Sequence, residues 1–348
     1  VPAPQRVSLA KRRRAIAGFV HAALVVGTLL LAAGFLSGAA AAFTAAAVLL
    51  RSGFAVFIVA MASGLARAPG SSATARMLHA VALALAVTVA LGVTLAAGRT
   101  FPAILSSVPL SELHPGWTLL GWVGLLVAAV AQKVVPMFQL TPDYPGALSR
   151  RFGAAVLVAL TLWSVAILFG SDVGVLAVMI ALTALYAIFA VMTLRLQQRR
   201  RRRRFDVNLL FWRIGMVCAV AASLTWLGSS RAGDPALPLL TGVLAILGAT
   251  LSVTTGMFYR IMPFLAWFHL YTRAGASPLV PHLKQYLAES WQRRQLALHL
   301  AWIAVAVLAT AWPQAAARVA AVALAASALQ WLVNLLAIFR VYAHHAAA

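Results

Sequence analysis

His114 to Pro145 reads HPGWTLLGWVGLLVAAVAQKVVPMFQLTPDYP, an apolar run that ends in a lysine, a proline and a polar segment. We call residues 114–145 the anchor stretch. A helix of about 20 apolar residues spans the ~30 Å of bilayer hydrocarbon, and the anchor stretch is long enough to do so. Its Leu, Ala and Val residues lack the alternating ten-residue pattern of a β-barrel strand. The anchor stretch therefore predicts a transmembrane helix.

The whole chain has the composition of a membrane protein. Of its 348 residues 63% are hydrophobic and 10% are charged, and the mean hydropathy is +0.93. A water-soluble globule of this length could not cover so much apolar surface. Because lipid offers no hydrogen bonds, the backbone must satisfy itself within helices. We expect an all-α, polytopic bundle.

Apolar runs of span length recur along the chain and predict ten helices. They cover residues ~15–36, 40–65, 77–97, the anchor stretch, 153–170, 174–195, 208–228, 238–260, 294–312 and 316–341. We expect one transmembrane domain, 15–343, between a basic N-terminal segment, 1–14, and a tail, 344–348.

Basic residues predict the topology. They gather at residues 11–14 and 67–76 and in the Arg-rich loop 195–206, where six arginines follow one another from Arg199 to Arg204. The positive-inside rule places these segments and both termini in the cytoplasm. We expect a multi-pass protein of a bacterial inner membrane, with anionic lipid head groups at the arginine run. The net charge of +22 is explained by topology, so nucleic acid is not an expected partner.

The segment PHLKQYLAESWQRR follows the eighth span. As a helix over 281–293 it would place Leu283, Leu287 and Trp291 on one side and polar residues on the other. This pattern predicts a helix lying in the membrane interface. A helix packed on the protein is the alternative.

Lys133-Val-Val-Pro136 and Arg260-Ile-Met-Pro263 each place a basic residue three positions before a proline. We call this the basic-x-x-Pro motif. Proline kinks a helix, and a cation one turn earlier can extend to the interface. The two cations either snorkel or flank a shared anionic site. Because the motif returns after four spans on the same side, it fits a parallel repeat of four helices.

Arg51 lies near the middle of the second span. A charge at that depth costs at least ~2.5 kcal/mol, so it needs a partner or water. The six acidic residues map to loops or helix ends. Arg51 could hold an anionic ligand, a haem propionate, a lipid head group or the carbonyl end of a broken helix. Alternatively, the residues before it lie in the interface.

Three histidines, His21, His79 and His299, lie at similar depth near the cytoplasmic ends of their spans. They could form one metal or haem site if their helices are neighbours. Each could instead bond a carbonyl or interfacial water. No catalytic motif occurs: the chain has no Walker loop, dinucleotide fingerprint, HExxH or GxSxG. No catalytic residue is therefore predicted.

The anchor stretch and its echo GMFYRIMPFLAWFHLYTR resemble signatures of bacterial membrane proteins near the haem-copper oxidase subunit I and NnrS-type superfamily. The resemblance implies arcs of four helices and a link to haem, copper or nitric oxide metabolism. Subunit I enzymes also use a histidine pair on an inner helix. The only adjacent pair, His344-His345, follows the last span, so an active oxygen or nitric oxide reductase is not expected.

Three functions remain open. The first is a divergent relative of subunit I that lacks the usual active-site histidines and binds haem, copper or neither. The second is a permease for a small anionic solute, with Arg51, Lys133 and Arg260 along its route. The third is a non-catalytic scaffold or assembly subunit, with a membrane protein or a second copy as partner.

Overall fold

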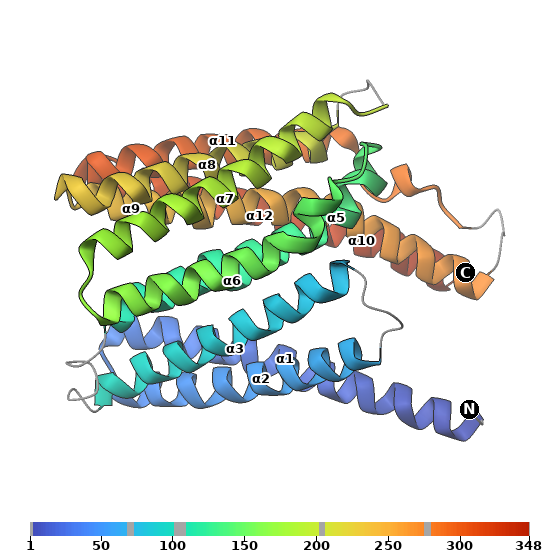
Figure 1. Ribbon diagram of the computed structural model, residues 1–348. Coiled ribbons are helices and arrows are strands. Elements are labelled where there is room, and N and C mark those ends of the chain that lie inside the picture. Colours follow the sequence, from blue (N-terminus) through green and yellow to red (C-terminus); the bar gives the residue numbers. More distant parts are fainter. Residues whose placement is uncertain (1–2, 68–72, 101–108, 202–205, 275–279, 348) are drawn as a thin grey trace. The chain divides into compact units, whose positions relative to one another are not determined.

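The computed structural model describes residues 3–67, 73–100, 109–201, 206–274 and 280–347, and every regular element in these ranges is a helix (Figure 1). Ten of the described helices are long and apolar enough to cross a membrane. They run over Arg13–Ser37, Ala40–Ala66, Ala73–Gly98, Leu110–Gln139, Gly146–Leu168, Asp172–Gln198, Val207–Ser229, Ala236–Arg273, Glu289–Ala311 and Pro313–Ala346. The expected all-α class and the ten spans are confirmed.

The chain groups into two compact units, which we describe separately. Unit 1 comprises Val1–Val130 and Pro145–Leu182, and unit 2 comprises Ala131–Tyr144 and Thr183–Ala348. The single transmembrane domain expected from the sequence stays a prediction.

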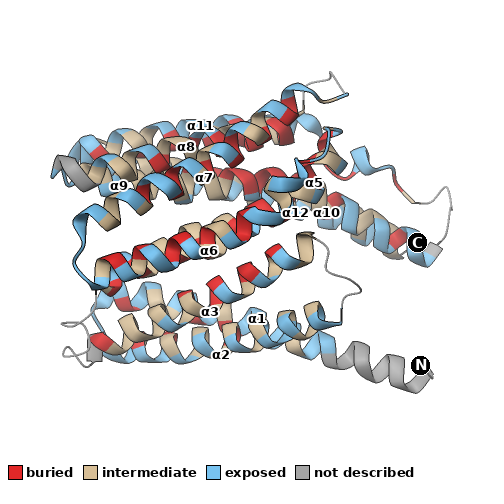
Figure 2. Ribbon diagram, in the orientation of Figure 1, coloured by how far each residue is buried: buried red, intermediate tan, exposed pale blue. Residues whose placement is uncertain are grey.

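Unit 1 is built around α3. Its elements are α1 (Ala3–Ser37), α2 (Ala40–Ala66), α3 (Ala73–Thr100), α4 (Leu110–Gly116), the π-helical segment η2 (Trp117–Gly124), the start of α5 (Leu125–Gln139), α6 (Gly146–Leu168) and the start of α7 (Asp172–Gln198). α1 packs on α2 and α2 packs on α3, which also packs on α4, η2 and α6. Leu85, Leu125 and Leu160 are fully buried there, whereas α2 carries few buried residues (Figure 2).

Unit 2 is built around α8 and α10. It holds the rest of α5 and α7, then α8 (Val207–Ala232), α9 (Ala236–Gly242), the π-helical segment η3 (Val243–Thr250), α10 (Leu251–Ala274), the 3₁₀ turn η4 (Leu283–Gln285), α11 (Glu289–Ala311) and α12 (Pro313–Ala347). α8 packs on η3 and α10, and α11 packs on α12 and η3. Phe211, Tyr286 and Ile338 lie at the centre of its main apolar cluster.

The fourth and eighth spans have the same internal order. Each begins with a seven-residue α-helix, α4 or α9, continues with an eight-residue π-helical segment, η2 or η3, and ends in a longer α-helix. Each of these longer helices contains one proline, Pro136 in α5 and Pro263 in α10. π-Helical turns are rare, so their presence at matched places supports the parallel repeat.

Glycine allows a close helix approach at the same place in both spans. A Cβ on Gly121 of η2 would lie 3.2 Å from the Ala84 Cβ in α3. A Cβ on Gly248 of η3 would lie 2.8 Å from the Cys218 Cβ in α8. Each π-helical segment therefore packs against the span that precedes it in the chain.

The stretch 281–293 is not one helix. The His282 side chain accepts a bond from the Lys284 amide and starts the turn η4, and α11 begins only at Glu289. Leu287, expected on the membrane-facing side, is 6% exposed and belongs to the main cluster of unit 2. The predicted interfacial helix is replaced by a capped turn that packs on the protein.

Candidate functional site

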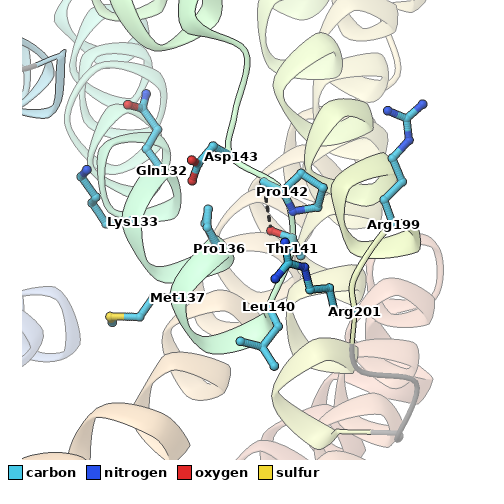
Figure 3. A pocket seen from close by; sticks show the side chains of 10 residues that line it. All are labelled: Gln132, Lys133, Pro136, Met137, Leu140, Thr141, Pro142, Asp143, Arg199 and Arg201. Atoms are coloured by element: carbon cyan, nitrogen blue, oxygen red, sulfur yellow. Dashed lines mark hydrogen bonds between the residues drawn. The ribbon is translucent and has the colours of Figure 1, made fainter.

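Unit 2 contains a pocket where α5 ends. Its volume is about 530 Å³, and Lys133 lines it together with Arg199 and Arg201. The remaining lining residues are Gln132, Pro136, Met137, Leu140, Thr141, Pro142 and Asp143. Figure 3 shows that the lining comes from the last turns of α5, the segment after it, and the residues that follow α7.

A backbone contact joins the two sides of this pocket. Leu140, the residue after α5, has a φ of 55°, the only positive φ among the described residues other than glycine. This left-handed conformation turns the chain out of the helix, and the Leu140 carbonyl accepts a hydrogen bond of 3.0 Å from the Arg201 amide. The bond holds residue 201 of the arginine run beside the end of α5.

The segment that follows α5, residues 140–144, ends in a buried tyrosine, Tyr144. The Thr193 hydroxyl donates to the Phe189 carbonyl, so it accepts the 2.9 Å hydrogen bond from the Tyr144 hydroxyl. The Tyr144 ring also stacks on Phe189 at 6.1 Å. Burial raises the pKa of the Tyr144 hydroxyl, which keeps it protonated and able to donate. Residues 140–144 are thus tied to α7 and to the residues after it.

The pocket carries a positive charge. Lys133, Arg199 and Arg201 contribute three cations against one carboxylate, Asp143. Within the described ranges none of the three cations forms an ion pair. Figure 3 shows Lys133 and Arg199 at opposite edges, while the Arg201 side chain extends toward Thr141. Three cations at one pocket favour a bound anion.

Polar side chains in the pocket lining could orient a bound anion by hydrogen bonds. Gln132 and Thr141 offer an amide and a hydroxyl, and Asp143 accepts hydrogen bonds. Met137 and Leu140 give the pocket an apolar part. Pockets of 300–1,000 Å³ suit small molecules, so this one can hold a small organic anion that also carries a donor such as a hydroxyl or ammonium group.

The second cation of the repeat is paired. The Arg260 guanidinium, in α10, forms an ion pair with the Asp206 carboxylate at the start of α8. Asp206 also caps α8 by accepting from the Asn208 amide at 3.0 Å. The Asn208 side chain accepts from Gln139 of α5 at 3.2 Å and donates to the Gly256 carbonyl of α10. One network therefore joins α5, α8 and α10.

The two basic-x-x-Pro motifs come close together in unit 2, but they do not share a site. Phe138 and Phe264, which follow the two prolines, form an edge-on ring pair at 6.4 Å. Lys133 lines the pocket, whereas Arg260 pairs with Asp206 and is not among the lining residues. Of the three predicted ligand-binding cations, Lys133 is the one that the pocket contains.

Arg51 belongs to unit 1. It is exposed and lies in the continuous helix α2, as the twelfth of its 27 residues. The residues before it therefore belong to the same span and do not form a separate interfacial segment. Neither of the ion pairs found among the described residues involves Arg51.

The three predicted metal-binding histidines belong to different units: His21 and His79 lie in unit 1 and His299 lies in unit 2. No three His, Cys, Asp or Glu side chains within the described ranges could hold a metal ion together. His21 and His79 are exposed, and the His79 Nδ1 lies 2.8 Å from the Ala75 carbonyl.

The third histidine, His299, is 1% exposed and already has two partners. Its Nδ1 accepts from the Trp302 indole at 3.2 Å, so Nε2 carries the proton and donates to the Ser252 hydroxyl at 2.7 Å. The predicted three-histidine site stays a prediction.

Sequence reasoning missed part of the pocket. The sequence predicts anionic lipid at the arginine run, whose residues 202–204 lie outside the described ranges. It does not predict that residue 201 lines a pocket. Thr141 and Asp143 belong to the polar end of the anchor stretch, TPDYP, which was the available signal. Nothing in the sequence indicated that this end would meet the residues after α7.

No protein-family model matches the chain, and neither the curated proteins nor the solved structures include a significant match.

Proposed function

We propose that the protein is a membrane permease that binds a small organic anion at the Lys133 pocket. The observation that carries this proposal is the meeting of three cations, none of which forms an ion pair with another described residue, in a pocket of small-molecule size. Asp143 on the same lining favours an anion that also has a hydrogen-bond donor. The topology predicted from loop charge puts this pocket at the cytoplasmic face of an inner membrane.

The architecture supports transport. The fourth and eighth spans are interrupted by π-helical segments and prolines at matched positions. In transporters, helices interrupted at corresponding places of two repeats commonly lie near the substrate route. The pocket lies at the end of one such span, where a solute would enter or leave.

Uptake into proteoliposomes tests the proposal. We would measure uptake of a radiolabelled short-chain hydroxycarboxylate and of an acidic amino acid, with full-length protein and with the variants Lys133→Ala and Arg201→Ala. At least one solute should be taken up, and each variant should reduce that uptake about tenfold or more. Arg195→Ala is the matched control, because Arg195 is an exposed cation of α7 outside the pocket. Equal loss with Arg195→Ala, or no uptake of any probe, would contradict the proposal.

The function implied by the resemblance, in haem, copper or nitric oxide metabolism, stays a prediction. So does the scaffold role. An absorbance spectrum and elemental analysis of the purified protein test the first directly. Bound haem or copper that is lost in both His79→Ala and His299→Ala would favour it over transport.

A further inference from the structure

We propose that the outward face of α2 docks a transmembrane helix of another protein, and that this helix carries an aspartate or glutamate at mid-depth that pairs with Arg51. This inference is independent of the proposed transport function. It rests on the depth of Arg51, the exposure of the α2 face around it, and the position of every carboxylate in the chain.

Arg51 lies near the middle of α2. Arg51 is the twelfth of the 27 residues of α2, so it lies within about one turn of the helix midpoint. The nearer edge of the hydrocarbon is then about two turns of helix away. Long basic side chains extend to the interface from positions near helix ends, and Arg51 does not occupy such a position.

The face of α2 that carries Arg51 is exposed. Thr44, Val48, Arg51, Ala55 and Val59 are all exposed and recur every three or four residues, so they form one stripe. We call it the Arg51 stripe. On another side of α2, Gly53 packs against Ala23 and Leu24 of α1. Figure 2 shows α2 as mainly exposed and intermediate along its length. The small residues Thr44 and Ala55 allow a second helix to approach closely.

The positions of the acidic residues indicate which kind of partner could pair with Arg51. The chain has six acidic residues, and the structure places each of them within the first turn of a helix or in a connection. They are Glu112, Asp143, Asp172, Asp206, Asp234 and Glu289. None of them lies near the middle of a described span, as Arg51 does. A second copy of the chain has the same six acidic residues, so a protein carboxylate at the depth of Arg51 would have to come from a different protein.

A designed helix tests the recognition. Full-length protein would be reconstituted in phosphatidylcholine vesicles at pH 8 with a fluorescent Leu/Ala transmembrane peptide that has either Asp or Leu at its centre. Energy transfer measures association. The Asp peptide should bind roughly three to thirty times more tightly than the Leu peptide, the range measured for polar contacts between membrane helices.

Two variants locate the effect. Arg51→Leu should bring the ratio of the two affinities close to one, and it removes an exposed charge, so it should not impair folding. Arg67→Leu, at the C-terminal cap of the same helix, should leave the ratio unchanged. Equal binding of both peptides would overturn the proposal. An unchanged ratio in Arg51→Leu, or a preference that appears only when anionic lipid is added, would do the same.

Cross-linking tests the native partner. A photoreactive side chain at Val48, one turn from Arg51 on the same stripe, would be activated in native membranes. We expect a cross-linked transmembrane peptide with a central carboxylate, and a yield that falls about tenfold in Arg51→Leu. Adducts to lipid alone or to a second copy, or no adduct at all, would show that the stripe faces something else.

Discussion

The Arg201 amide and the Leu140 carbonyl, 3.0 Å apart, join two segments separated by two membrane spans. This bond depends on the left-handed conformation of Leu140, which turns its carbonyl away from the axis of α5. It shapes the pocket by placing a basic loop residue next to Thr141.

Leu140→Gly should stabilise the protein by up to about 1 kcal/mol, because glycine adopts a positive φ without the steric cost that other residues carry. Leu140→Val should destabilise it by a similar amount, since β-branched side chains fit this conformation poorly. Unfolding in a titration of mixed detergents measures both. Equal effects of Gly and Val would show that the conformation of residue 140 contributes little to stability.

Asp206→Asn should lower the free energy of unfolding by about 1–3 kcal/mol, because it leaves the Arg260 guanidinium, 31% exposed, without its carboxylate. Asparagine still caps α8, so the loss reports on the ion pair alone. Adding Arg260→Met should recover much of the loss. A double variant whose loss equals the sum of the single losses would show that the two residues do not interact.

Gly248→Ala should destabilise the protein by about 1–3 kcal/mol, because the added Cβ would lie 2.8 Å from the Cys218 Cβ and force η3 away from α8. Gly242→Ala in the same span is the control, since a Cβ there meets no other atom within 4 Å. Its effect should stay within about 0.5 kcal/mol. Similar losses at both glycines would argue against close packing of the π-helical segment.

His299→Leu should cost about 2–4 kcal/mol, because it leaves the Ser252 hydroxyl and the Trp302 indole buried without their common partner. Ser252→Ala should cost less, since it breaks only one of the two bonds. Thermal unfolding of the purified protein compares them. If His299→Leu unfolds like the native chain, these bonds are not structural, and His299 becomes a stronger candidate for ligand binding.

The sequence motif around Lys133 and Arg260 is a local pattern, whereas the partners of these two cations depend on distant segments. The basic-x-x-Pro motif marks two spans that share a π-helical segment followed by a proline. It was wrong about the end of the eighth span, because α10 continues past Pro263 to Ala274. The motif could not show that Arg260 pairs with Asp206 while Lys133 lines a pocket. The two motifs are alike in sequence, and only their neighbours from other segments differ.

Residue order is enough to establish the all-α class and the ten apolar helices of span length, because hydropathy and helix length act locally along the chain. The tertiary structure decided the rest. The contact of residue 201 with Leu140, the buried bonds of His299 and the turn at 283–285 depend on which distant segments meet. Such meetings follow from the packing of whole helices, and no local pattern of residues specifies them.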